Sequence, residues 1–219
     1  LRGQGLLAHT IGADLSDEAA RSRLVQTITE GVGPLHCVVN NASLFEPDTG
    51  LDFEPALARS QLEVNLIAPL TLARDLARQM AAQPAPEDAC VIHVLDQKVF
   101  NLNPDYFSYS ISKLALERAV ALQAQALAPR VRVCGVAPGL MFLSGPQAPE
   151  NFERASRVNL LRRPTDPAQV AQTCVFLASH TGITGTTVNV DSGQHLVPLE
   201  RDVMFVVDEL LQEAGHAPR

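Results

Sequence analysis

The amino-acid sequence predicts an α/β protein built on a Rossmann-type, doubly wound parallel sheet. Short β-branched or apolar runs alternate with longer runs of helical period, which is typical of a sheet covered by helices on both faces. With 219 residues, 46% of them hydrophobic, the chain fits one domain with a sizeable core. We therefore expect a single domain over residues 1–219, with a substrate loop at 139–166 and a C-terminal tail at 198–219.

The individual elements follow from the same periodicity. Strands are expected at Leu6–Leu15, Leu35–Asn40, Ala89–Leu95, Val131–Ala137 and Thr186–Asp191. Helices are expected from Asp17 to about Glu30 with Ser16 as N-cap, and at Ser60–Ala82, Phe107–Ala128, Pro167–Ser179 and 201–214. The stretch 139–166 is rich in Pro, Gly and Asn and is expected to be irregular.

The start of the chain departs from a complete dinucleotide-binding fold. No G-x-G-x-x-G turn follows a strand there, because Gly3 and Gly5 precede the first expected strand. That turn normally holds the pyrophosphate of the cofactor. We expect the natural polypeptide to carry a further βαβ unit, about 30 or more residues, before Leu1. Without it, the Leu6–Leu15 strand would lack a neighbour.

The composition argues against several function classes. The formal net charge of −7 disfavours nucleic acid, since a polyanion would meet a repulsive average field. No apolar run reaches the roughly 18 residues of a membrane span, and the first residues lack the pattern of a secretory leader. The cysteines form no C-x-x-C pair and are expected to be small buried residues in a reducing compartment. We expect a cytoplasmic protein without a metal site.

Tyr109 and Lys113 carry the strongest chemical signal. Their spacing of four in Tyr109-Ser-Ile-Ser-Lys113 puts both side chains on one face of the expected helix. A free tyrosine, with a pKa of about 10, is a poor acid–base catalyst at neutral pH. An ammonium group one turn away favours the phenolate and lowers that pKa. The pair therefore predicts proton transfer by Tyr109.

Further segments add to this signal, and some of them follow strands, at the carboxyl ends where a parallel sheet binds ligands. Asn40-Asn41-Ala42-Ser43 directly follows a buried strand. Asn65 stands inside a helical pattern shortly before Pro69, a locally unfavourable place that indicates a functional or strained site. The remaining segments are Pro138-Gly139 after the VRVCGVA strand, and Thr184-Gly185 and Asp191-Ser192-Gly193 around the last strand.

In this order the segments resemble the short-chain dehydrogenase/reductase family over nearly the whole chain. The family's N-N-A-G appears as Asn40-Asn41-Ala42-Ser43, and its Y-x-x-x-K as Tyr109 and Lys113. Its remaining motifs fall on Asn65, Pro138-Gly139, Ile183-Thr184-Gly185 and Val190-Asp191-Ser192-Gly193. The resemblance implies an NAD(P)H-dependent oxidoreductase.

The resemblance also implies where the cofactor and a second subunit lie. The implied cofactor residues are Asp14 and Leu15 at the adenine, Asn41, Ala42, Ser43, Pro138, Gly139 and Leu140 along the cofactor, and Tyr109 and Lys113 at its nicotinamide end. Asn65 holds Lys113 through a water molecule in the family. NADPH is the expected cofactor, with NADH left open. A stripe of small and apolar residues predicts a homodimer or homotetramer, formed by Ala115, Ala119, Leu122 and Ala126.

Asp96 departs from the usual pattern of the family. Most members place a serine about 13 residues before the tyrosine, where this chain reads Val91-Ile-His-Val-Leu-Asp96. A serine hydroxyl donates to a carbonyl oxygen, whereas an ionised aspartate only accepts and repels a developing alkoxide. Aspartate therefore suits a substrate that presents N–H donors, or it acts as an acid when protonated.

Asp96 and the run Asn41-Ala-Ser-Leu-Phe45 resemble the pteridine reductases and dihydromonapterin reductases. In those enzymes the serine bonds the pterin and the aromatic ring stacks on it, which implies these roles for Ser43 and Phe45. We expect an NADPH-dependent reductase of dihydropterins, with Asp96, Tyr109, Lys113 and Asn65 as its catalytic residues. Two alternatives stay open: an oxidoreductase of a ketone, sugar or acyl thioester, and a non-catalytic reductase-like scaffold.

Overall fold

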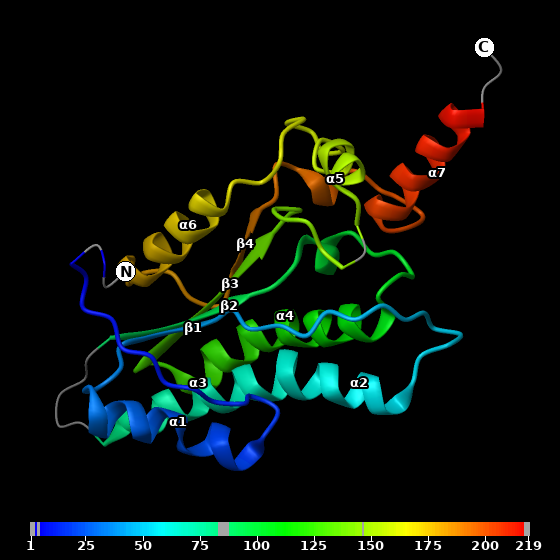
Figure 1. Ribbon diagram of the computed structural model, residues 1–219. Helices are drawn as coiled ribbons and strands as arrows, with labels where there is room; N and C mark the ends of the chain where they lie inside the picture. The colour runs from blue at the N-terminus through cyan, green and yellow to red at the C-terminus, as the bar shows by residue number, and fades with distance from the viewer. Residues whose placement is uncertain (1–2, 4, 83–87, 146, 217–219) are drawn as a thin grey trace.

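A four-stranded parallel sheet forms the centre of the molecule (Figure 1). Its strands lie side by side in chain order, β1-β2-β3-β4, and every neighbouring pair is parallel. The computed structural model describes residues 3, 5–82, 88–145 and 147–216. Its elements are α1 (Glu18–Gly31), β1 (Cys37–Asn40), α2 (Pro55–Leu62), the π-helix η2 (Glu63–Ile67), α3 (Ala68–Ala81), β2 (Ala89–Val94), the 3₁₀-helix η3 (Gln97–Phe100), α4 (Phe107–Leu127), β3 (Val131–Pro138), α5 (Pro149–Ala155), α6 (Pro167–Ser179), β4 (Thr187–Val190), the 3₁₀-helix η4 (Gln194–Leu196) and α7 (Val203–His216).

Helices cover both faces of the sheet. α3 and α4 pack on one face, α1 lies against α3, and α6 packs on the other face (Figure 1). Alternate residues of β2 enter the two cores: Val91 packs with α3 and α4, whereas Ile92 packs with α6. This alternation follows from the period of two in a strand and explains why the strands read as continuous apolar runs. The predicted doubly wound α/β fold is confirmed.

Several boundaries differ from the prediction for local reasons. α1 is capped by Asp17 rather than Ser16, because the Asp17 carboxylate accepts from the backbone nitrogens of Ala19 and Ala20. The helix expected to begin at Ser60 begins at Pro55, since proline suits a first helical turn. The loop at 139–166 contains α5, which also begins at a proline. Such starts are visible in sequence only when proline is taken as a helix signal.

The prediction of a strand at Leu6–Leu15 is wrong. The sheet does not include this segment, and β1 at its edge pairs with β2 alone. Most of the segment's side chains are exposed, with Leu7 at 92%. A strand is stable only when its backbone groups join a ladder, so the apolar pattern does not suffice here. The expected N-terminal βαβ unit stays a prediction.

The cysteines and helices bear on the remaining expectations. Cys90 and Cys134 are buried, but Cys37 is exposed because β1 lies at the sheet edge, and Cys174 is half-buried. The expectation of four buried cysteines is therefore wrong for Cys37. Within the residues that the structure describes, no helix is long and apolar enough to cross a membrane, and no His, Cys, Asp and Glu side chains gather as a metal site.

Arg132 connects β3 to the end of α6. Its guanidinium donates to the carbonyl oxygens of Leu177 at 2.9 Å, Ala178 at 2.9 Å and Ile183 at 3.1 Å. It also binds the carboxylate of Asp88 at 3.0 Å. The last carbonyls of a helix have no partner within the helix. Arg132 thus satisfies buried acceptors that a hydrophobic side chain would leave unpaired.

We expect Arg132→Met to lower the free energy of unfolding by about 2–4 kcal/mol, because it orphans buried carbonyl oxygens and removes an ion pair. Denaturant titration measures the effect. Arg118→Met is the matched control: its side chain is 82% exposed, so we expect a change within about 0.5 kcal/mol. Equal losses for the two variants would contradict the role of Arg132.

Candidate active site

Tyr109 and Asp96 meet at the carboxyl end of β2. The Tyr109 hydroxyl donates to Asp96 Oδ2 at 2.8 Å, and Tyr109 is only 5% exposed. Asp96 follows β2 directly, and its Oδ1 accepts from the backbone nitrogen of Lys98 at 2.8 Å, which caps η3. The end of one strand and the first turn of α4 therefore bring together two residues that the sequence singled out.

Lys113 lies one helical turn beyond Tyr109, as its spacing predicts. Its ammonium donates to the carbonyl oxygen of Val94 at 2.9 Å and lies 5.7 Å from the centre of the Tyr109 ring. Lys113 is 3% exposed, and burial lowers its pKa to about 8. The nearby carboxylate of Asp96 opposes this shift because it favours the ammonium form.

The acid–base state of Tyr109 differs from the prediction. Burial, followed by the charge of Asp96, raises the pKa of Tyr109 above its usual value. The expectation that Lys113 lowers this pKa is wrong in this structure, because desolvation and the carboxylate outweigh the ammonium. Burial also raises the pKa of Asp96, against the opposing hydrogen bond from Lys98. Tyr109 therefore holds its proton at neutral pH. Asp96 takes up a proton at a higher pH than an ordinary aspartate does.

Asn65 organises the segment that follows β1. Its Oδ1 accepts from the Leu44 nitrogen at 2.8 Å and from the Ser43 hydroxyl at 3.2 Å. Its Nδ2 donates to the Leu44 carbonyl at 2.8 Å and to Ser112 Oγ on α4 at 3.0 Å. Asn65 lies in the π-helix η2, a rare element that often marks functional sites. The water link from Asn65 to Lys113 stays a prediction.

Phe45 and Tyr106 form the aromatic wall of the site. Their ring centres lie 4.1 Å apart at an interplanar angle of 16°, and Tyr109 approaches Phe45 edge-on at 4.6 Å. Tyr106 has a left-handed backbone with φ of 55°, which is unusual for a bulky residue. Asp48 supports this turn by accepting from the nitrogens of Phe107 and Ser108. Phe45 thus already has a planar partner within the chain.

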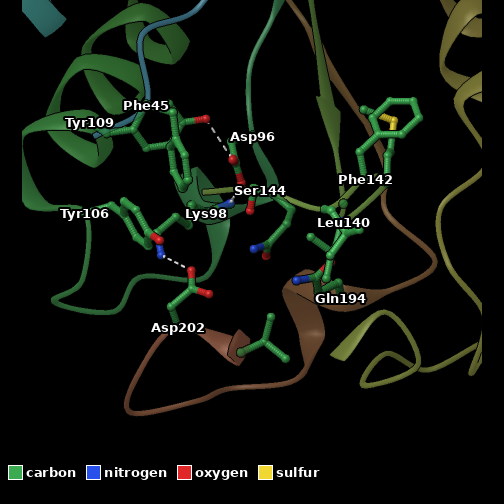
Figure 2. A pocket seen from close by; sticks show the side chains of 15 residues that line it. Phe45, Asp96, Lys98, Tyr106, Tyr109, Leu140, Phe142, Ser144, Gln194 and Asp202 are labelled. Atoms are coloured by element: carbon green, nitrogen blue, oxygen red, sulfur yellow. Dashed lines mark hydrogen bonds and ion pairs between the residues drawn. The ribbon is translucent and has the colours of Figure 1, made fainter. Parts of the chain in front are cut away.

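A cavity of about 260 Å³ is lined by Phe45, Asp96, Tyr106 and Tyr109, whereas Asn65 and Lys113 lie behind its wall (Figure 2). The segment after β3 forms the opposite wall, with Gly139, Leu140, Met141, Phe142, Leu143 and Ser144. A Cβ at Gly139 would lie 2.8 Å from Gln194 Oε1 and 2.9 Å from Asp191 Cα, so only glycine fits. The backbone nitrogen of Leu140 donates to Gln194 Oε1 at 2.9 Å. This bond turns the amide nitrogen of Gln194 toward the cavity (Figure 2).

Lys98 and Asp202 close the floor of the cavity. Their side chains pair at 2.7 Å, and Lys98, which is 3% exposed, also donates to Asn103 Oδ1 at 2.8 Å. The neighbouring pair of Asp105 and Arg201 is bidentate, with distances of 2.9 to 3.0 Å. These two ion pairs fasten the start of α7 to the loop before α4.

A second, smaller cavity lies beside β1 and the segment that follows it. It measures about 140 Å³ and is lined in part by Leu15, Asn41 and Ala42. Asp14 is exposed beside Leu15, and the hydrogen bonds from Ser16 lower its pKa. Three of the predicted cofactor residues therefore share one cavity, whereas Pro138, Gly139 and Leu140 lie at the end of β3, where Gly139 and Leu140 line the larger cavity.

Sequence reasoning missed several residues of the larger cavity. Gln97 and Lys98 directly follow Asp96, and Tyr106 precedes Tyr109 by one helical turn, so proximity to a predicted residue could have indicated them. Gln194 and Asp202 come from distant parts of the chain. No sequence pattern connected them with the site. Their positions depend on the tertiary packing of η4 and α7.

Comparison with known proteins places this geometry in a family. A family model described as enoyl-(acyl carrier protein) reductase, of the short-chain dehydrogenase/reductase type, matches residues 3–195. The chain therefore belongs to the short-chain dehydrogenase/reductase family of oxidoreductases. The predicted resemblance is confirmed.

Individual relatives narrow the comparison. The crystal structure of FolM alternative dihydrofolate reductase 1 from Brucella canis, complexed with NADP, has a TM-score of 0.83 and 37% identity, over 89% of this chain and 76% of that one. An uncharacterized oxidoreductase of Mycobacterium tuberculosis is 30% identical, over 88% of this chain and 75% of its own. Dihydromonapterin reductase of Enterobacter sp. is 26% identical, over 86% of this chain and 78% of its own.

His93 connects the end of β1 to α4 inside the core. It is fully buried, with Nδ1 at 3.2 Å from Asn40 Nδ2 and Nε2 at 2.9 Å from Gln123 Oε1. Because the amide nitrogen donates and the amide oxygen accepts, the ring is neutral with its proton on Nε2. The chain of bonds joins the end of β1 to α4, which carries Tyr109.

We expect His93 to make stability depend on pH in the acid range. Burial lowers the pKa of His93 to about 4 from its usual 6.5. Between these values the unfolded chain binds more protons than the folded chain, so stability falls as the pH falls. The full loss is on the order of 3 kcal/mol.

Chemical denaturation at about pH 7 and about pH 4 measures this effect. His93→Gln is the control, because glutamine stays neutral and offers both a donor and an acceptor. The variant should lose less unfolding free energy than the parent over the same interval. An equal loss would show that other groups cause the acid sensitivity.

Proposed function

We propose that this enzyme reduces a dihydropterin to a tetrahydropterin with NADPH. The observation that carries the proposal is the buried hydrogen bond between Tyr109 and Asp96 beside the aromatic ring of Phe45. A carboxyl group in this place accepts N–H donors or supplies a proton, and it disfavours a developing alkoxide. The names of two relatives, a dihydromonapterin reductase and an alternative dihydrofolate reductase, support the same substrate class.

The residues around the proposed cofactor site fit an extended dinucleotide. Exposed Asn41, Ala42 and Ser43 follow β1, and Gly139 leaves the end of β3 without a side chain. Asp14 and Leu15 lie at the far end, and Lys113 and Tyr109 at the reactive end. NADPH supplies the hydride when it is bound. The cofactor's NADP form is favoured by the relative that is complexed with NADP.

The chain's own contribution is control of a proton. Tyr109 holds its hydroxyl proton at neutral pH, since its pKa is raised. We assign it the transfer of this proton to the ring nitrogen of the substrate that becomes basic when a hydride is added. Asp96, with its raised pKa, returns a proton to Tyr109 across their 2.8 Å hydrogen bond. The buried ammonium of Lys113 stabilises the phenolate between these two transfers. Asn65 positions the segment of Ser43 and Leu44.

Phe45 provides the surface on which the pterin ring stacks. Tyr106 shares a parallel orientation with Phe45 at 4.1 Å, so the ring face already suits a planar partner. Substrate stacking on this face requires the Tyr106 ring to move. Ser43 precedes Phe45 by two residues, and its hydroxyl, now bonded to Asn65, can turn to a substrate.

We expect Asp96→Asn to reduce dihydropterin turnover by about 100-fold or more, because it removes the proton source. Binding of NADPH should change little, since Lys113 and Asn41 are untouched. NADPH oxidation and NADPH fluorescence titration measure the two quantities. Loss of NADPH binding in this variant would indicate a structural fault instead of a catalytic one.

Asp96→Ser separates pterin reduction from ketone reduction. It restores a hydroxyl donor at the usual serine position of the family, so a carbonyl reductase should tolerate it and a pterin reductase should lose activity. The assay is NADPH oxidation with a dihydropterin and with a panel of ketones. Strong ketone turnover by the variant, together with no dihydropterin turnover by the unmodified enzyme, would refute the proposal.

We also propose that α4 joins two subunits. Leu122 is 65% exposed, and Ala126 beside it is exposed, whereas Ala115 and Ala119 are half-buried. The stripe is therefore only partly covered by the chain's own sheet. Small residues allow close approach of a second helix.

We expect Leu122→Arg to convert a dimer into monomers, because it places a charge in a desolvated helix contact. Light scattering at micromolar concentration measures the mass. Gln26→Arg on α1 is the control and should leave the mass unchanged. A monomeric parent protein would contradict the proposed interface.

A further inference from the structure

Gln97 is a buried polar residue in the wall of the candidate active site. It directly follows Asp96, lines the same cavity and is 8% exposed. Its Oε1 is buried and has no hydrogen-bond partner among the residues that the structure describes. Buried polar atoms are nearly always paired, and leaving one unpaired is costly. Such an atom at a cavity wall indicates a ligand that donates to it.

The turn that contains Gln97 is held in place by the residues on either side of it. Asp96 Oδ1 accepts from the Lys98 nitrogen and so caps the 3₁₀ turn that contains Gln97. The Lys98 side chain is in turn held by Asp202 at 2.7 Å and Asn103 at 2.8 Å. Gln97 therefore stands in a turn that is anchored at both ends. The residue thus lines the cavity from a fixed backbone, with its Oε1 buried just behind the wall.

Asp96 itself is already engaged. Its Oδ2 accepts from the Tyr109 hydroxyl and its Oδ1 from the Lys98 nitrogen. A substrate with several N–H donors needs a further acceptor beside this carboxyl, and Gln97 Oε1 is next in the chain. The carboxamide also carries a donor on the same carbon, so it matches an edge with adjacent N–H and acceptor groups. A simple ketone offers no such edge.

We propose that Gln97 is the residue that recognises the N–H edge of the substrate's pyrimidinone ring. Its Oε1 accepts from a ring N–H or from the exocyclic amino group, while Asp96 and Tyr109 handle the proton. The inference rests on the proposed pterin reduction and adds a specificity residue to it. Gln97 acts on substrate binding and not on the chemical step.

Gln97→Met tests the proposal, because methionine has a similar length and no polar amide. We expect the KM for dihydropterin to rise roughly 5- to 100-fold, as one donor of the substrate loses its partner. We expect kcat to stay within about threefold, and NADPH affinity to stay unchanged. Gln172→Met, at an exposed position of α6, is the matched control and should alter neither value.

Substrate analogues show whether the amide reads an N–H group. Binding of pterin, of an analogue without the exocyclic amino group and of an N3-methylated analogue is measured in the presence of NADP. The parent enzyme should bind at least one analogue more weakly than pterin, and Gln97→Met should abolish this difference. The same loss for all three ligands, or unchanged pterin binding in the variant, would overturn the role of Gln97.

The outcomes separate this inference from the function on which it rests. If the unmodified enzyme does not reduce dihydropterins, the proposed function fails. If it reduces them and Gln97→Met has an unchanged KM, only the role of Gln97 fails. Two measurements on the variant exclude a folding defect. If its fold is intact, its thermal unfolding and its NADPH affinity should match those of the unmodified enzyme.

Discussion

The hydrogen bond between Tyr109 and Asp96 is the constraint on which the site depends. It places a phenol and a carboxyl 2.8 Å apart in a buried setting, where desolvation raises the pKa of both groups and the carboxylate raises that of Tyr109 further. A surface pair of the same type would stay solvated, and its pKa values would shift little. The two groups are buried because β2 ends beside the cavity and α4 begins next to that strand end. The sheet and the helix therefore each supply one partner of this hydrogen bond.

Long-range ion pairs keep that contact enclosed. Lys98 with Asp202, and Asp105 with Arg201, join a loop near the middle of the chain to residues about 100 positions later. Partners this far apart incur a large loop-closure entropy before they meet, so their geometry must be supported by the packing of α7. Removing one partner of the buried pair would leave an uncompensated charge beside Asp96. The C-terminal segment is thus part of the site's electrostatics as well as its wall.

The sequence predicted the fold well where periodicity and packing agree. The strands β1 to β4 and the helices α1, α3, α4 and α6 appear close to their expected positions, because each buries an apolar face. Leu6–Leu15 failed because its apolar pattern lacked a ladder partner. The predicted pair of Tyr109 and Lys113 lies on one helical face, but the pKa of Tyr109 shifts in the opposite direction. Spacing reveals which groups are near, whereas burial decides which charge state they hold.

A carboxyl group in place of a hydroxyl changes what this family architecture can bind. A serine at this strand end would donate to a carbonyl oxygen at any pH, whereas Asp96 accepts when ionised and donates when protonated. Burial raises the pKa of Asp96, so its protonated form persists to a higher pH than in an ordinary aspartate. In the proposed reaction, N–H groups of the substrate would stabilise the ionised form, and loss of a proton to Tyr109 would restore that form after protonation. The same side chain can therefore hold the substrate and supply the proton, provided that a neighbouring acceptor such as Gln97 takes over part of the recognition.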